Sequence, residues 1–203
     1  MGLYEKYLLP KLLNMAMKSP DMTRIREQLV PLAGGKVLEL GVGSGLNLPF
    51  YRAGTKVTGV DPSLELQAYA REVAHKHRVD VEFVAQSAES LDFADNSFDS
   101  VVVTWTLCTI PDPAAALAEV RRVLKPSGKL IFAEHGQAPE PHVVKWQNRI
   151  NPVWRHVGGG CNLNRRPDET MTQTGFTFDD LATGYITGPK WATYTYQGVA
   201  RIA

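Results

Sequence analysis

Five short apolar runs recur through the first two thirds of the chain, and most of them end in glycine or polar residues. They occupy residues 37–40, 57–60, 81–85, 100–105 and 129–133. Runs this short that are apolar at nearly every position are typical of strands buried on both faces of a parallel sheet. The pattern therefore predicts five central strands.

Longer segments with helical spacing separate these runs. Residues 46–51 predict a short helix, and residues 64–77 predict a longer one. In residues 113–124 the apolar positions fall on one side, and Pro113 suits the first turn. Strands that alternate with helices form βαβ units, which predicts a doubly wound sheet.

The start of the chain differs from this middle part. Residues 3–32 predict helix in two pieces, with Ser19 as the N-cap and Pro20 at the first helical position of the second piece.

After Gly136 the pattern changes again. The chain is rich in Pro, Gly, Trp and Asn as far as Pro167, and it predicts no regular element there. A helical stretch follows at 168–173. Two β-like runs at 176–186 and 192–202, joined through Gly-Pro, predict a hairpin. The fold class expected is α/β, with a Rossmann-like, doubly wound, seven-stranded sheet that is mostly parallel and carries an antiparallel C-terminal edge hairpin.

Composition narrows the class of protein. The 203 residues suit one domain, and 44% apolar with 21% charged residues is ordinary for a globular chain. A net charge of +1 offers no general attraction to nucleic acid, so we expect no such partner. Two cysteines, no spanning apolar run and no signal-peptide pattern lead us to expect a cytoplasmic protein.

The sharpest motif is Glu-Leu-Gly-Val-Gly-Ser-Gly-Leu-Asn at residues 39–47, between a predicted strand and a predicted helix. Asp61 ends the next strand 20 residues after Gly41, where a carboxylate can accept both hydroxyls of a ribose. The third glycine comes one residue too early for a dinucleotide loop. Glu39 beside the loop would repel a pyrophosphate but attract a cation, which predicts a positively charged ligand. Alternatively, the glycines only make a tight turn and Asp61 caps a helix.

These residues, together with 86–91, 96–99 and 120–128, resemble the class I S-adenosylmethionine-dependent methyltransferases over about residues 34–135. The resemblance implies S-adenosyl-L-methionine as cofactor and S-adenosyl-L-homocysteine as product. It also implies three parts within a single methyltransferase domain. These are an N-terminal helical lid (1–33), a cofactor-binding core (34–135), and a substrate-covering segment with the C-terminal hairpin (136–203).

The resemblance also assigns roles to particular residues. Those expected to contact the cofactor are Tyr7, Glu39, Gly41, Gly43, Gly45, Asn47, Asp61, Pro62, Ser87, Ala88, Glu89, Thr104 and Trp105. Most relatives carry an acidic residue where Ser87 stands. Trp105 would face the sulfonium, or it is an ordinary core aromatic.

The ends of the chain are similar to a narrower group. Residues 3–12, 47–51, 134–136 and 159–165 resemble small-thiol methyltransferases, and bacterial phospholipid N-methyltransferases share the N-terminal helix and the glycine motif. Thiol S-methylation is therefore favoured. Methylation of a phospholipid amine at the membrane surface, or cofactor binding without catalysis, are the alternatives.

The acceptor is expected to be a small molecule that meets residues around the end of the fifth strand. His135 is the candidate general base or thiolate stabiliser, or else it satisfies a nearby carbonyl. The substrate-contacting candidates are Tyr4, Tyr51, Cys161 and Arg165. Cys108 is expected in the core. His75 and His77 lack a carboxylate cluster, so no metal site is predicted.

Two partner questions follow from the sequence. Residues 104–107 read Thr-Trp-Thr-Leu rather than the Asp/Asn-Pro-Pro-aromatic clamp of nucleic-acid amino-methyltransferases, which disfavours that class. Three lysines beside leucines in the N-terminal helix would allow weak contact with an anionic membrane surface. The pattern says nothing about oligomeric state.

Overall fold

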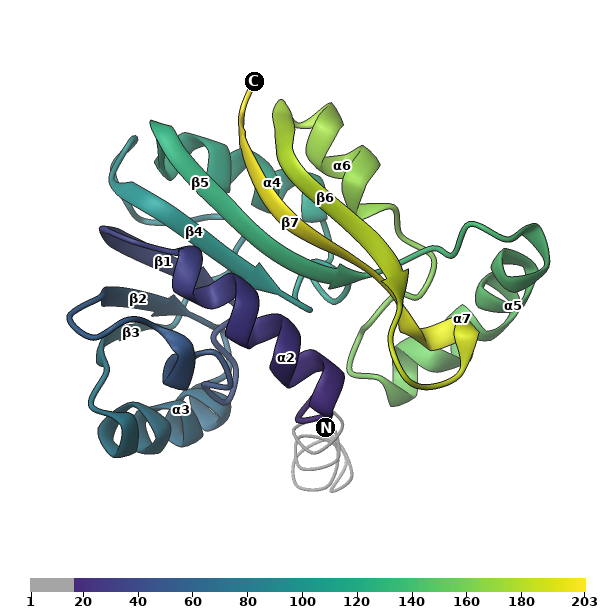
Figure 1. The fold of residues 1–203 in the computed structure, drawn as a ribbon, viewed down its shortest axis with the longest axis horizontal. Helices are drawn as coiled ribbons and strands as arrows, with labels where there is room; N and C mark the ends of the chain where they lie inside the picture. The colour runs from purple at the N-terminus through teal and green to yellow at the C-terminus, as the bar shows by residue number, and fades with distance from the viewer. Residues whose placement is uncertain (1–16) are drawn as a thin grey trace.

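A seven-stranded mixed sheet forms the centre of the molecule. The computed structural model describes residues 17–203, and Figure 1 shows the sheet with helices against it. The strand order is β3-β2-β1-β4-β5-β7-β6. The strands are β1 (Lys36–Leu40), β2 (Lys56–Val60), β3 (Asp80–Val84), β4 (Phe98–Thr104), β5 (Leu124–His135), β6 (Phe176–Tyr185) and β7 (Tyr194–Ile202).

The five strands β1 to β5 run parallel, and β7 pairs antiparallel with both β5 and β6. This arrangement confirms the predicted fold class, including the antiparallel hairpin at one edge. The strand order reverses between β1 and β4. In open α/β sheets, ligands bind beside the loops that follow the strands at such a point.

Alternation along the buried strands divides the core between the two faces. Leu38, Val101 and Val103 pack with α4 (Pro113–Val123) on one face. Their neighbours Val37 and Val102 pack on the opposite face, against α2 (Pro20–Leu29) and α3 (Leu64–His77). Figure 1 shows α2 crossing in front of the sheet and α4 behind it. Because both faces are covered, central strands such as β1 and β4 are buried at nearly every position, whereas the edge strand β3 stays partly exposed.

Polar side chains cap the starts of α2, α3 and α4, and the first of these caps was predicted. Ser19 accepts a hydrogen bond from the amide of Met22, and Pro20 opens α2, as expected. Ser63 caps α3, which spans the predicted 64–77, and Asp112 caps α4. The expected helix at 46–51 is a single 3-10 turn, η3 (Leu48–Phe50), and a second such turn, η2 (Val30–Leu32), follows α2. The first predicted N-terminal helical piece falls mainly outside the described residues.

One long helix stands where no element was predicted. The helix α5 (Pro141–Val157) fills most of the Pro-, Gly-, Trp- and Asn-rich stretch, and it starts with a proline at its first position. Pro152 lies inside it and cannot donate the helical hydrogen bond at that point. Apolar residues such as Val143, Ile150 and Val157 do recur at helical spacing, but the Pro-, Gly-, Trp- and Asn-rich composition and the internal proline led the sequence analysis to expect no helix here.

The remaining short helices hold the C-terminal part in place. They are α6 (Pro167–Gln173), close to the predicted 168–173, and α7 (Lys190–Thr193), which lies in the β6–β7 connection. Figure 1 shows α5 and α7 together beyond the carboxyl end of β5. Within the described part of the chain, no helix is long and apolar enough to cross a membrane.

Candidate active site

The glycine loop after β1 is held against the end of β2. The amides of Gly41 and Val42 both donate to the carbonyl of Val60, at 2.8 and 3.1 Å. Gly41, Gly43 and Gly45 all have positive φ, between 52° and 80°, which a side chain disfavours. A Cβ at Gly43 would meet only one backbone oxygen, 3.8 Å away, so open space lies over this glycine.

Asp61 braces this loop from the end of β2. One carboxylate oxygen accepts from the amide of Gly43 and the other from the amide of Ser63, each at 2.9 Å. Pro62 separates Asp61 from the N-cap of α3. The side chain is 8% exposed, and burial raises the pKa of Asp61 above its ordinary value, while these two amides lower it. The two amide bonds fix the carboxylate beside the open face of the loop.

Glu39 is the second carboxylate. It is the penultimate residue of β1, just before the glycines, and it is 1% exposed. One of its oxygens accepts from the side-chain amide of Asn47, and the other accepts from the hydroxyl of Tyr51, both at 2.9 Å. Asn47 also donates to Thr104 at 3.0 Å, which links the ends of β1 and β4. Burial raises the pKa of Glu39 to about 7, against the lowering effect of these bonds and of Arg26.

Arg26 of α2 completes this network from the other side. Its Nε donates to Asn47 Oδ1 at 3.1 Å, and its guanidinium lies 4.6 Å from the ring centre of Trp105. The side chain is buried, which lowers the pKa of Arg26 to about 10. Through Asn47, a buried cation and a buried carboxylate are joined across the carboxyl edge of the sheet.

Trp105 occupies a strained position directly after β4. Its φ is 49°, in a region that non-glycine residues rarely adopt, and its amide donates to the carbonyl of Ala133. The ring is 7% exposed and packs in the core under Arg26. Its indole N–H is buried and finds no partner among the described residues. Strain of this kind tends to occur at functional sites.

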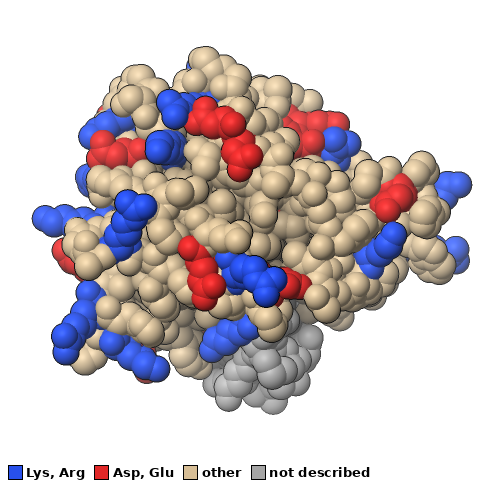
Figure 2. Space-filling view, in the orientation of Figure 1, with Lys and Arg blue, Asp and Glu red and all other residues tan. Residues whose placement is uncertain are grey.

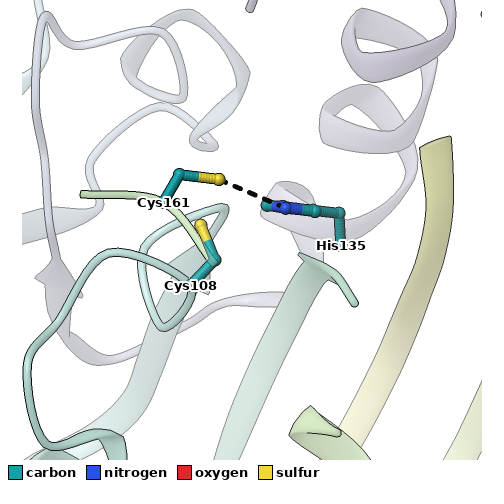
Figure 3. Close-up of side chains that lie close together, drawn as sticks. All are labelled: Cys108, His135 and Cys161. Carbon is teal, nitrogen blue, oxygen red and sulfur yellow. Dashed lines mark hydrogen bonds between the residues drawn. The ribbon is translucent and has the colours of Figure 1, made fainter. Parts of the chain in front are cut away.

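A second group of side chains gathers at the ends of β4 and β5. Cys108, His135 and Cys161 offer three ligand atoms that all lie within 4.8 Å of one another. Figure 3 shows the three side chains converging from three different segments. A hydrogen bond joins Cys161 Sγ to His135 Nε2 at 3.2 Å, and the indole of Trp154 donates to the same sulfur at 3.3 Å.

The pKa values of the three side chains in this group shift in different directions. The hydrogen bond from Cys108, together with the hydrogen bond and charge of His135, lowers the pKa of Cys161 although burial opposes them. Burial lowers the pKa of His135, but the hydrogen bond and the charge of Cys161 outweigh it, so the net shift is upward. The hydrogen bond to Cys161 and then burial raise the pKa of Cys108. This arrangement favours a thiolate on Cys161 beside a charged imidazole.

Comparison with known proteins agrees with this geometry. A family model described as "Methyltransferase domain" matches residues 38–132. Thiol S-methyltransferase TMT1B of Rattus norvegicus is 38% identical over 145 residues, which cover 70% of this chain and 59% of that protein. Human thiol S-methyltransferase TMT1A is 32% identical over 169 residues, which cover 81% of this chain and 69% of that protein. The chain belongs to the S-adenosylmethionine-dependent methyltransferases.

Further relatives within the methyltransferases extend the comparison. Phosphatidylethanolamine N-methyltransferase of Cereibacter sphaeroides is 38% identical over 104 residues, which cover 50% of this chain and 51% of that protein. The chain spans about three fifths of the length of the rat relative.

Two solved structures share the fold. A methyltransferase of Methanosarcina mazei superposes with a TM-score of 0.63 at 26% identity, over 82% of this chain and 92% of that one. The trans-methyltransferase CalH, solved in complex with SAH, superposes with a TM-score of 0.66 at 22% identity, over 97% of this chain and 59% of that one.

The donor of this methyltransferase family fits the groups at the first site. S-Adenosylmethionine carries an ammonium, a sulfonium and a ribose with two hydroxyls. The buried carboxylate of Glu39 suits a positive charge, and the carboxylate of Asp61 suits hydroxyl donors. The open space above Gly43 lets a ligand approach the backbone closely. The two carboxylates thus match the charged and the ribose parts of the donor, and the open space leaves room for it.

The predicted adenine residues form a small network in the loop after β3. Ser87 donates to Glu89 at 2.9 Å and accepts from the amide of Glu89. The other oxygen of Glu89 accepts from the amide of Asp112, at the start of α4. Ala88 packs against the core. The hydroxyl and carboxylate therefore meet each other at the surface beside the site.

The predicted substrate residues fall into three groups. Cys161 meets His135, as described above. Arg165 donates to the carbonyls of Leu107, Ile110 and Pro111, so it fastens its own segment to the loop after β4. Tyr51 is 7% exposed and uses its hydroxyl on Glu39. Tyr4 and Tyr7 lie outside the described residues.

Several residues of the site escaped the sequence analysis. Arg26 gave no signal in the sequence because it lies in α2, before β1 and outside the glycine motif. Glu134, an acid at the end of an apolar strand, was noted only in the motif with His135. It is 0% exposed, and one oxygen accepts from the amides of Thr106 and Leu107 at 2.8 and 3.0 Å. Burial raises the pKa of Glu134 to about 7. This side chain shapes the loop that carries Cys108.

Proposed function

We propose that this chain transfers a methyl group from S-adenosylmethionine to a small thiol. One observation carries the donor part of the proposal. Two carboxylates, Glu39 and Asp61, are held buried by hydrogen bonds at the carboxyl ends of β1 and β2, on either side of the glycine loop. S-Adenosylmethionine supplies the activated methyl group, so the chain itself must position the two reactants, exclude water and manage a proton.

The donor-binding roles follow the order of the elements. Glu39 and Asn47 would hold the positively charged methionine end over Gly41, Gly43 and Gly45. Asp61 and Pro62 would hold the ribose, and Ser87, Ala88 and Glu89 the adenine. Thr104 and Trp105 lie at the end of β4, where Thr104 accepts from Asn47 and Trp105 packs against Arg26. That placement suits residues that flank the sulfonium.

The acceptor side is proposed at His135 and Cys161. A thiol acceptor needs only a weak base to be activated, because a small fraction of the thiol is already ionised to thiolate at neutral pH. A charged imidazole at His135 would favour the thiolate of an acceptor as it favours that of Cys161. Arg165 would act by holding the loop after β4 against this side of the site. The relatives named thiol S-methyltransferases support a thiol as the acceptor.

The three-part organisation remains part of the proposal. Arg26 reaches from α2 to Asn47, which supports a covering role for residues 1–33. Asn162 donates twice to the carbonyl of Cys108, from its backbone and its side chain, which supports a covering role for the segment after α5.

A panel of acceptors with isotopically labelled donor tests the proposal. Small alkyl and aryl thiols should give labelled thioethers, while phenols and amines of similar size should give little product by mass spectrometry. His135→Ala should lower turnover with thiols while donor affinity survives, and His75→Ala on the surface of α3 is the control. Labelled product from phenols or amines and none from thiols would contradict the thiol assignment.

A second candidate function is methylation of a phospholipid amine. Trp146, Val153 and Val157 of α5 are 57%, 67% and 47% exposed, and basic residues such as Lys145 and Arg149 lie on the same helix. Exposed apolar groups with cations nearby suit a lipid surface. The resemblance to a phosphatidylethanolamine N-methyltransferase supports the same alternative.

Vesicles distinguish the two candidates. The lipid candidate predicts labelled lipid from phosphatidylethanolamine vesicles and loss of that product in the Trp146→Ala, Val153→Ala double variant. The thiol candidate predicts unchanged thiol turnover in the same variant.

Figure 2 shows acidic and basic side chains interspersed on the face drawn, which gives that face no uniform field for a polyanion.

A further inference from the structure

We propose that Cys108, His135 and Cys161 form a zinc site whose fourth position takes the sulfur of the acceptor. Two cysteines and a histidine with one open position are a ligand set that zinc uses in catalytic sites. Only the identity of the fourth ligand rests on the proposed thiol methylation. The metal site itself departs from the expectation, drawn from the sequence, that the chain holds no metal ligands.

The first argument is convergence. Cys108 lies in the loop after β4, His135 ends β5, and Cys161 follows α5. Their ligand atoms nevertheless lie within 4.8 Å of one another, with Cys161 Sγ and His135 Nε2 at 3.2 Å. Around tetrahedral zinc, with bonds of about 2.3 Å to sulfur and 2.0 Å to nitrogen, such atoms lie roughly 3.6–3.8 Å apart. Shifts of about 1 Å or less would complete the set.

The second argument is availability of the ligand atoms. His135 Nε2 has Cys161 itself as its partner, and Cys108 Sγ makes a long contact of 3.6 Å to the carbonyl of Trp105. In Figure 3 the two sulfurs and the imidazole edge face a common point. A metal entering there would replace the contacts among the ligands and, among bonds to the rest of the chain, the long one from Cys108 to Trp105.

The third argument is the surrounding support. Trp154 donates to Cys161 Sγ, a bond that a metal-bound thiolate can still accept. Asn162 donates to the carbonyl of Cys108 at 2.8 Å from its amide and 3.0 Å from its side chain, which holds Cys161 beside Cys108. Outer partners of this kind orient metal ligands in known sites.

Charge balance favours this metal class. Two thiolates neutralise one zinc ion, so the loaded site adds no net charge to a largely buried position. Two protons leave to water as the zinc bonds form, one from the Cys108 thiol and one from the His135 imidazolium, because Cys161 is already a thiolate. When an acceptor thiol binds the fourth position, its S–H bond breaks, the proton passes to water, and the sulfur electron pair forms a bond to zinc. The acceptor then stands as a thiolate at the end of β5, and in the loaded site the zinc ion takes the place of the charged His135 imidazole as the group that stabilises it.

Cobalt(II) is the probe for the test, because it takes tetrahedral sulfur sites and is coloured. Reduced, metal-free full-length protein should bind one equivalent of Co²⁺ with thiolate-to-metal charge-transfer absorption, and Zn²⁺ should displace it. Cys161→Ser and His135→Asn should each weaken binding at least tenfold. The His75→Asn, His77→Asn double variant on α3 is the matched control and should bind as the parent does.

The outcomes separate the parts of the proposal. Absence of the charge-transfer absorption in the parent protein, or an unchanged titration in Cys161→Ser, would overturn the metal site. So would a loss of two titratable thiols in the absence of reductant together with no metal uptake after reduction, because that result indicates a Cys108–Cys161 disulfide pair. Circular dichroism checks the fold of each variant.

The fourth ligand is tested on the cobalt protein without any methyl donor. Addition of 2-mercaptoethanol should change the cobalt spectrum at saturating thiol, whereas 2-methoxyethanol, which lacks the thiol, should not. An unchanged spectrum would overturn the acceptor part. Because no methyl transfer is measured, failure of the proposed methylation leaves this result interpretable.

Discussion

At the scale of single residues, the two buried carboxylates beside the glycine loop have different surroundings. Asp61 is held by backbone amides, while Glu39 is held by the side chains of Asn47 and Tyr51. Side-chain partners move more easily than a backbone turn. Burial raises the pKa of Glu39 to about 7, so near neutral pH the side chain is only partly ionised, in a site that suits a cation.

Donor affinity should therefore depend on pH through Glu39. A cationic ligand favours the carboxylate, so below about pH 7 binding must release a proton, and affinity should fall by up to roughly tenfold per pH unit. Above pH 7 affinity should level off. Calorimetry with S-adenosylmethionine between about pH 5.5 and 8, in buffers of different ionisation enthalpy, measures both the affinity and the proton release.

Glu39→Gln should remove this pH dependence and weaken binding about 10- to 100-fold. The control is Glu82→Gln, an exposed acid on β3.

The raised pKa of Glu39 also destabilises the ligand-free fold as pH rises from about 4.5 through 7, because Glu39 ionises at lower pH in the unfolded chain than in the folded one. A pH dependence that persists in Glu39→Gln would show that another group titrates.

At the scale of elements, the glycine loop is constrained by both conformation and space. Gly41 has φ of 72°, and a Cβ there would lie 2.4 Å from side-chain atoms of Thr106. Gly54 has a similar φ of 82°, but nothing lies within 4 Å of a Cβ built there. The pair separates the cost of the backbone conformation from the cost of crowding.

Gly54→Ala should lower the free energy of unfolding by about 1–2 kcal/mol, the cost of a left-handed conformation. Gly41→Ala should cost a further 1–3 kcal/mol, roughly, because Thr106 must move. Urea unfolding measures both values. Equal losses in the two variants would mean that the loop after β4 gives way freely.

The unexpected helix α5 is fixed by one fully buried side chain. Gln147 accepts from the amide of Ala138 and donates to the carbonyls of Gly136, Leu163 and Trp191. It thereby joins α5 to the end of β5, to the segment after α5 and to α7. No periodicity in the sequence marks a residue of this kind.

Gln147→Leu should lower stability by about 2–4 kcal/mol, since it leaves several buried backbone groups without partners. Gln173→Leu, at the exposed end of α6, should change stability by less than about 0.5 kcal/mol. Thermal unfolding of both variants provides the comparison. Similar melting temperatures for the two would argue against Gln147 as the organising residue of this region.

The sequence predicted those elements whose burial is uniform. The central strands of the parallel sheet are covered on both faces and therefore appear as apolar runs, and α3 and α4 carry clear caps. It failed for α5, because the proline inside the helix and the Gly- and Asn-rich surroundings masked apolar residues that do recur at helical spacing. It also failed for Arg26, because its contact with Asn47 joins positions far apart in the chain. Cys108 is buried as expected, but nothing in the sequence marked its closeness to Cys161.

At the scale of the whole molecule, binding of the donor or its product should stabilise the folded chain. A ligand at 100 times its Kd adds about 2.7 kcal/mol to the free energy of unfolding. For a chain of this size each kcal/mol shifts Tm by about 2–4 °C, so S-adenosylhomocysteine should raise Tm by roughly 5–10 °C. NAD at the same concentration should leave Tm unchanged. A shift with NAD alone would contradict the assignment of the first site.

The order of the strands has a consequence for how the chain is made. β7 leaves the ribosome after β6, yet it lies between β6 and β5 and pairs with both. Until it emerges, nascent β5 keeps a bare hydrogen-bonding edge, and β6 has no partner in the sheet. The sheet can thus be closed only after translation of its last strand, and chains halted before that point would expose an edge that invites aggregation.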